Sequence, residues 1–141
     1  MRLLRPLLMA LALMAAAGSV QAQGVSAADG AAIRGVIGRQ IEAFRRDDAP
    51  GAFAFASPGI QGMFGTPERF LDMVRRAYPA VHRPRGVEYR DLLQEGGRIV
   101  QQVELIGQDG QPQLALYEME RDGGTWRIAG CTLVPSPRVG T

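Results

Sequence analysis

The sequence predicts an α+β domain in which three helices come first and pack on one face of a curved four-stranded antiparallel sheet. Two observations predict this order. Apolar residues recur every three or four positions through residues 33–77, whereas they alternate with polar residues from 87 to 134. Glycine-rich pairs separate the alternating runs, which is typical of strands joined by tight hairpins. Helices and strands that occupy separate halves of a chain indicate the α+β class.

The first helix is the longest. Its apolar stripe consists of Ile33, Val36, Ile37, Ile41 and Phe44. Ser26 or Asp29 can cap its start. Gly35 and Gly38 weaken it, each by roughly 1 kcal/mol relative to alanine, so we expect another element to approach closely there.

Two shorter helices follow. Asp48 caps the second helix, Phe53–Ala56 forms its body, and residues 57–59 end it. Thr66 caps the third, with Pro67 in its first turn, and Tyr78-Pro79 closes it.

The loop between these two helices, residues 59–65, carries Ile60, Met63 and Phe64, which is unusual for a solvated segment. It could be a lid over a pocket, an oligomer contact, or a segment folded into the core.

Four strands are expected at 87–92, 99–106, 114–120 and 126–134. The connecting turns are Gly96-Gly97, Asp109-Gly110 and Gly123-Gly124. Because such turns reverse the chain within a few residues, the strands pair antiparallel in sequence order.

The first 22 residues have the order of a secretory signal peptide. Arg2 and Arg5 precede an apolar run at 7–17, and Val20-Gln21-Ala22 fits a signal peptidase site. We expect cleavage after Ala22 and a periplasmic or secreted protein, the alternative being an uncleaved anchor. A loose leader is then expected at 23–28, one domain at 29–135 and a flexible tail at 136–141.

Loss of Arg2 and Arg5 would reduce the 16 basic residues to 14, equal to the 14 acidic residues. A near-neutral domain gives no reason to expect a nucleic-acid or anionic-membrane partner.

Several runs resemble a family of small exported bacterial proteins of unknown function. They are IRGVIGRQIEAFRRDDAPGAFAFASPGIQGMFGTPERFLDMVRRAYPAVHRP, QQVELIGQDGQ, YEMERDGGTWRIAGC and the closing LVP, and they span roughly 29–135. The resemblance implies the cone-shaped fold of SnoaL-like and nuclear-transport-factor-two-like proteins, a cystatin-like cone. It further implies a cavity between the sheet and the first helix, and pairing of two copies through the sheet. It implies no chemistry and no cofactor.

The strand pattern assigns residues to the two sheet faces. One face is expected to carry Tyr89, Gln101, Tyr117, Met119, Ile128 and Gly130, and the other Glu104, Glu118, Glu120 and Arg127. A register slip of one residue would reverse this assignment. The pocket candidates are therefore Tyr89, Gln101, Tyr117, Met119 and Phe64.

Few residues suit other kinds of site. Arg83 and Arg85 flank Pro84 and could grip a carboxylate or phosphate, or simply keep a loop soluble. His82, the only histidine, is expected to be a solvated loop residue, the alternative being a base at the mouth of a pocket. Cys131, the only cysteine, is expected to be a small buried hydrophobe, the alternative being a thiol that pairs with a partner protein. With one histidine and one cysteine, no metal site or Ser-His-Asp arrangement is expected.

Three functions remain open. The first is a non-enzymatic module that binds a small apolar or amphipathic molecule in the cone or a partner protein on the sheet. The others are an isomerase- or hydratase-like enzyme and a structural envelope protein. A carboxylate or histidine bonded to Tyr89 or Tyr117 in a closed cavity would favour the enzyme, and a cavity without carboxylates would favour binding.

Overall fold

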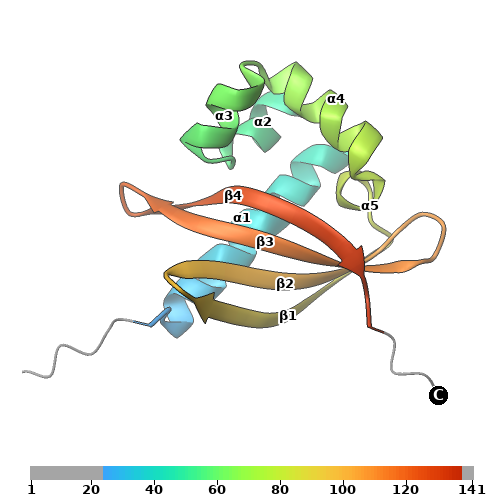
Figure 1. Ribbon diagram of the computed structural model, residues 1–141. Helices are drawn as coiled ribbons and strands as arrows, with labels where there is room; N and C mark the ends of the chain where they lie inside the picture. Colours follow the sequence, from blue (N-terminus) through green and yellow to red (C-terminus); the bar gives the residue numbers. More distant parts are fainter. Residues whose placement is uncertain (1–23, 138–141) are drawn as a thin grey trace, which may run out of the picture.

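The computed structural model describes residues 24–137, so the expected signal peptide lies outside the described residues. The chain forms a helical layer followed by one antiparallel sheet (Figure 1). The helices are α1 (Ala27–Arg45), α2 (Ala49–Ala54), α3 (Pro58–Phe64), α4 (Pro67–Ala77) and α5 (Pro79–His82). The strands are β1 (Gly86–Glu95), β2 (Arg98–Ile106), β3 (Pro112–Asp122) and β4 (Thr125–Pro135). The predicted α+β class is confirmed.

The sheet is a simple meander with strand order β1-β2-β3-β4, all neighbours antiparallel. Glycine supplies the positive φ angles of its two-residue hairpins: 55° and 77° at Gly96 and Gly97, and 57° and 85° at Gly123 and Gly124. Residues with a Cβ are strained at such angles, which explains why glycine occupies these turns. The four predicted strands are confirmed, and each is longer than expected.

Helix α1 lies behind the sheet in Figure 1 and covers its inner face with the predicted apolar stripe. Ser26 caps it in a reciprocal pair of hydrogen bonds with Asp29, so the helix begins inside the segment expected to be a loose leader. The close approach expected at the two glycines occurs at Gly38, where a Cβ would lie 3.1 Å from the Tyr89 hydroxyl oxygen. At Gly35 a Cβ would meet only Arg39 of the same helix.

The helical layer contains five helices within residues 24–137, two more than predicted. The expected loop at 59–65 is largely helix α3. Ser57 accepts a hydrogen bond from the Ile60 amide and Pro58 occupies the first turn, the same pattern that identified the helix after Thr66. The expectation of a loop was therefore wrong because Ser57-Pro58 starts a helix instead of only ending one. Pro79 likewise opens the short α5.

The face assignment of the sheet holds except at Gly130. A β-bulge between Glu118 and Met119 pairs Met119 with Ile128 but Glu118 with Gly130. The extra residue in β4 shifts the alternation, so Gly130 lies on the outer, Glu118 side and Cys131 pairs with Tyr117 on the inner side. The expectation that Gly130 faces inward was wrong for this reason.

Asp47 joins the end of α1 to the segment that leads into the sheet. It is the one non-glycine residue with a positive φ (52°) in the described chain. Its carboxylate accepts hydrogen bonds from His82 Nε2 and Arg83 Nη2, both at 2.7 Å, and lies 3.2 Å from Arg75 Nη2. His82 is not the solvated loop residue expected, because its side chain is only 13% exposed and bonded to Asp47.

Within residues 24–137, no helix is both long and apolar enough to cross a membrane.

We predict that Asp47→Asn lowers the urea midpoint of unfolding at neutral pH, because asparagine tolerates the positive φ but loses the charge. The hydrogen bond from His82 is the largest influence that lowers the pKa of Asp47 below its ordinary 3.8. The stabilisation is therefore complete above that pH and is lost as the pH falls through the lowered pKa. Urea titrations at several pH values would measure the unfolding midpoints of Asp47→Asn and of the wild type. We expect the difference between these two midpoints to become smaller below about pH 4.

Asp72→Asn is the matched control, because Asp72 forms an exposed i,i+4 pair with Arg76 and such pairs contribute little. A constant difference between Asp47→Asn and the wild type from pH 7 to pH 3 would contradict this role of the Asp47 charge.

Candidate functional site

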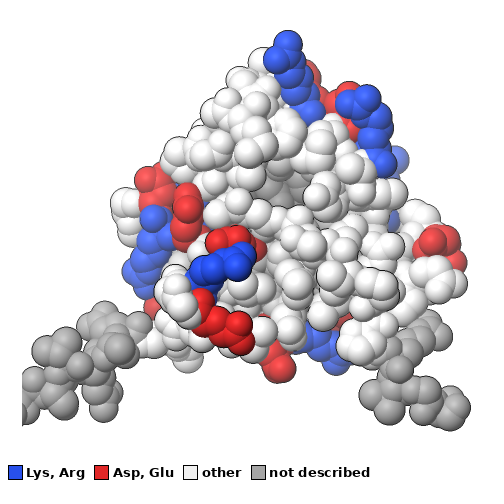
Figure 2. All heavy atoms as spheres, in the orientation of Figure 1, with Lys and Arg blue, Asp and Glu red and all other residues white. Residues whose placement is uncertain are grey.

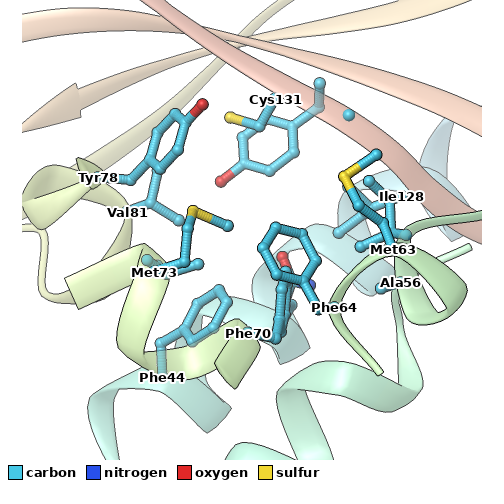
Figure 3. A pocket seen from close by; sticks show the side chains of 15 residues that line it. Phe44, Ala56, Met63, Phe64, Phe70, Met73, Tyr78, Val81, Ile128 and Cys131 are labelled. Carbon is cyan, nitrogen blue, oxygen red and sulfur yellow. The ribbon is translucent and has the colours of Figure 1, made fainter. Parts of the chain in front are cut away.

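The main candidate site is a cavity of about 260 Å³ between the helices and the inner face of β3 and β4. Figure 3 shows Met73 and Tyr78 on one side, Met63 and Ile128 on the other, and Cys131 on the strand above them. Figure 2 shows a hollow between the helical part and the sheet. The lining residues are Gln40, Phe44, Ala56, Ile60, Met63, Phe64, Phe70, Met73, Val74, Tyr78, Val81, Tyr117, Ile128, Gly130 and Cys131.

Aromatic packing builds the helical wall. The ring centroid of Phe70 on α4 lies 5.7 Å from that of Phe44, 5.5 Å from that of Phe53 and 5.6 Å from that of Phe64. Tilted rings at these distances interact favourably beyond the area that they bury. The cluster thus joins α1, α2, α3 and α4 and fixes the floor of the cavity.

Helix α3 forms the outer wall and is weakly anchored. It contains no buried residue, and Met63 is 74% exposed. The Gln61 amide donates hydrogen bonds to the carbonyls of Phe53 (3.0 Å) and Ala56 (3.2 Å), which tie the helix to α2. Gly65 ends it with a φ of 76°.

Tyr117 is the polar group of the inner wall. Its side chain is fully buried, and its hydroxyl has no hydrogen-bond partner among the described residues. Burial is the main cause that raises the pKa of Tyr117 well above its ordinary value, so the hydroxyl stays neutral. A buried hydroxyl without a hydrogen-bond partner destabilises the folded state by about 1–3 kcal/mol.

Cys131 stands across from Tyr117 on the neighbouring strand. Burial raises the pKa of its thiol from 9.0 to about 12, and the nearby Tyr117 hydroxyl partly opposes that rise. The two groups are close enough for each to shift the other's pKa, but a thiol is a weak hydrogen-bond partner, so the Tyr117 hydroxyl has no strong one.

Two further polar side chains line the cavity, namely Tyr78 on the helical side and Gln40, which is already engaged. Gln40 is buried, and its Nε2 donates a hydrogen bond to the Ala52 carbonyl at 3.1 Å. No Asp, Glu, His, Lys or Arg side chain is among the residues that line the cavity in the described part of the chain. The cavity is therefore mainly apolar and lacks charged side chains, and Tyr117 contributes a fully buried hydroxyl without a partner.

The structure brings two of the five pocket candidates, Tyr117 and Phe64, to this cavity. Tyr89, Gln101 and Met119 face the same side of the sheet but lie outside the lining, because they pack under α1 or in the core. The Tyr89 hydroxyl donates to the Arg34 carbonyl at 3.1 Å, and Met119 is buried in the core cluster. The Gln101 amide donates to the carbonyls of Arg90 (3.1 Å) and Gln102 (2.9 Å), where the register of β1 shifts.

The two anion-binding candidates do not act as a pair. The Arg83 guanidinium is bonded to Asp47, so the protein's own carboxylate occupies it. The Arg85 side chain lies near the Gly110 turn. Within residues 24–137, no group of three or more His, Cys, Asp or Glu side chains is positioned to hold a metal ion.

The sequence interpretation missed Gln40, Met73 and Tyr78 as lining residues. Met73 lies on the face of α4 next to Phe70 and Val74, and Tyr78 caps the end of that helix four residues after Val74, so the spacing contained the signal. Gln40 falls inside the apolar stripe of α1, where a polar residue marks either a buried hydrogen bond or a site.

We predict that Cys131 of the folded protein reacts slowly with iodoacetamide. A pKa near 12 lowers the thiolate fraction roughly thousandfold, which outweighs the higher nucleophilicity of that thiolate and leaves a slowing of roughly 30-fold or more. Alkylation followed by mass spectrometry, with and without urea, would measure both rates. Equal rates, after correction with a small thiol in the same buffers, would show that the thiol is not buried.

The fold has known relatives among solved structures. A crystal structure of a protein of unknown function with a cystatin-like fold, from Nostoc punctiforme, is similar with a TM-score of 0.54 and 10% identity, covering 82% of this chain and 96% of the other. An NTF-2-like protein of unknown function from Burkholderia xenovorans has a TM-score of 0.48 and 17% identity, covering 79% and 89%. At such identities the first likeness shows the fold alone, a cystatin-like cone.

No curated protein matches the chain. A family model described as "Domain of unknown function (DUF4864)" matches residues 26–141, which include every helix and strand described above. The chain belongs to this DUF4864 family.

Proposed function

We propose that this protein is a non-enzymatic binding module that holds a small apolar or amphipathic molecule in the cavity between α3, α4 and the sheet. The observation that carries the proposal is the lining of aromatic, aliphatic and methionine side chains around the buried, unpartnered hydroxyl of Tyr117. Binding sites for small molecules are concave and mostly apolar, with a few polar groups that orient the ligand.

The cavity size limits the ligand. An apolar cavity of roughly 150 Å³ holds one benzene molecule. By the same ratio, the 260 Å³ found here suits about ten or eleven non-hydrogen atoms. A fused two-ring compound, or one ring with a short chain, meets this limit.

The chemistry of the lining supports binding over the isomerase or hydratase alternative. Acid–base catalysis needs a titratable group whose pKa suits the operating pH and which reaches the substrate. Tyr117 and Cys131 are the two titratable side chains of the inner wall. Burial raises the pKa of each further above neutral pH, so neither is suited to exchange a proton with a ligand there. The carboxylates Glu104 and Glu118 belong to the opposite face of the sheet.

We predict that the protein binds naphthalene, a ten-carbon probe, and that Ile60→Trp weakens this binding at least tenfold by filling the space beside α3. Ile60 is half-buried and lines the cavity, so the larger ring has room to enter it. A chemical-shift titration by nuclear magnetic resonance would measure both affinities.

Val87→Trp is the size-matched control, since Val87 is exposed on β1 and does not line the cavity. Failure of the wild-type protein to bind any apolar probe of this size would refute the binding proposal.

A second candidate function is supported by the outer face of the sheet, which no helix covers in Figure 1. Half-buried uncharged side chains occupy it, namely Leu93, Val100, Gln102, Leu114, Leu116 and Val134. Figure 2 views this face and shows charged atoms mainly toward its rim. Patches of this kind often mark protein interfaces.

We propose a second copy of the chain as the occupant of this face. The rim charges neutralise one another within one chain, in the pairs Arg98–Glu118 (2.9 Å) and Arg90–Glu104 (3.3 Å). Two identical faces would therefore meet without opposing like charges, as an isologous dimer requires.

We predict that the wild-type protein sediments as a dimer and that Leu116→Arg converts it to a monomer by placing an unpaired charge in the interface. Analytical ultracentrifugation over a range of concentrations would measure this. Gln111→Arg, in an exposed turn, is the control and should remain dimeric. A wild-type monomer at high concentration would exclude this second function.

A further inference from the structure

The strongest unexplained feature of the molecule is the hydroxyl of Tyr117. It is a fully buried polar atom without a protein partner among residues 24–137, and it belongs to a side chain that lines the cavity. Buried polar groups in folded proteins nearly always have a partner, so each exception calls for an explanation.

Neighbouring groups do not supply that partner. Cys131 is directly opposite on β4 but offers only a weakly bonding thiol. The amide of Gln40, on the helical side of the cavity, donates its proton to Ala52. The protein thus leaves the bonding capacity of this hydroxyl open inside an otherwise apolar space.

Charge limits what can fill that space. An ion placed in the cavity would lose its hydration and meet no opposite charge, because no Asp, Glu, His, Lys or Arg side chain of residues 24–137 lines it. An uncharged oxygen loses less hydration, and it can recover a hydrogen bond from Tyr117.

Building on the proposed function, we propose that the ligand is an uncharged molecule of about ten non-hydrogen atoms whose one hydroxyl or carbonyl oxygen hydrogen-bonds to the Tyr117 hydroxyl. Its apolar body packs against Phe64, Phe70 and Met73.

The experiment compares 2-naphthol with naphthalene, two probes that differ by one hydroxyl. We expect the wild-type protein to bind 2-naphthol roughly fivefold or more tightly, the range of one net hydrogen bond. Tyr117→Phe removes only the hydroxyl oxygen and should abolish this preference while it still binds naphthalene, which also shows that the variant is folded. The anion 2-naphthoate should bind the wild type at least tenfold more weakly than 2-naphthol.

Tyr89→Phe is the matched control, because it removes a hydroxyl that is bonded to the Arg34 carbonyl outside the cavity. It should keep the preference for 2-naphthol. Equal binding of both probes by the wild type, a preference that survives in Tyr117→Phe, or tighter binding of 2-naphthoate would overturn this inference alone. No binding of either probe would overturn the proposed function itself, and this inference with it.

Discussion

The packing of the apolar stripe of α1 across the inner face of the sheet is the constraint on which the rest of the structure depends. Ile33 and Ile37 are fully buried there, and Gly38 allows Tyr89 of β1 to approach the helix backbone. A straight helix cannot follow a twisted sheet over its whole area, so space remains beside it. The shorter helices α2, α3, α4 and α5 cover that space (Figure 1). Asp47 ends α1 in a left-handed conformation and connects it to His82 and Arg83, which lead into the sheet.

The walls of the cavity come from elements that are held in place in different ways. The floor is rigid, since the Phe70 ring contacts three other phenylalanine rings from three helices. The inner wall belongs to the hydrogen-bonded sheet. The outer wall is α3, which is seven residues long and has no buried side chain. A cavity with one firmly packed side and one more exposed side suits a protein that admits and retains a small molecule.

Charge is distributed in a way that agrees with this interpretation. The ion pairs lie on the outer surface and at the joint around Asp47, whereas the lining of the cavity is neutral. A cavity without charges cannot orient a ligand by ion pairing, so orientation depends on shape and on hydrogen bonds such as that of the buried Tyr117 hydroxyl.

The sequence by itself determined the elements that depend on local chemistry. Alternation and glycine turns located the four strands, the stripe from Ile33 to Phe44 located α1, and Tyr117 and Phe64 were recognised as pocket residues. Only the tertiary structure decided three further features. The bulge opposite Glu118 moved Cys131 inward and Gly130 outward, because one extra residue reverses a period of two. Gln101 donates a hydrogen bond to a β1 carbonyl where the register of β1 shifts, and it does not line the cavity. His82 forms a hydrogen bond with the carboxylate of Asp47, 35 residues away. Such contacts arise between segments distant in sequence, whose mutual position no local pattern of residues specifies.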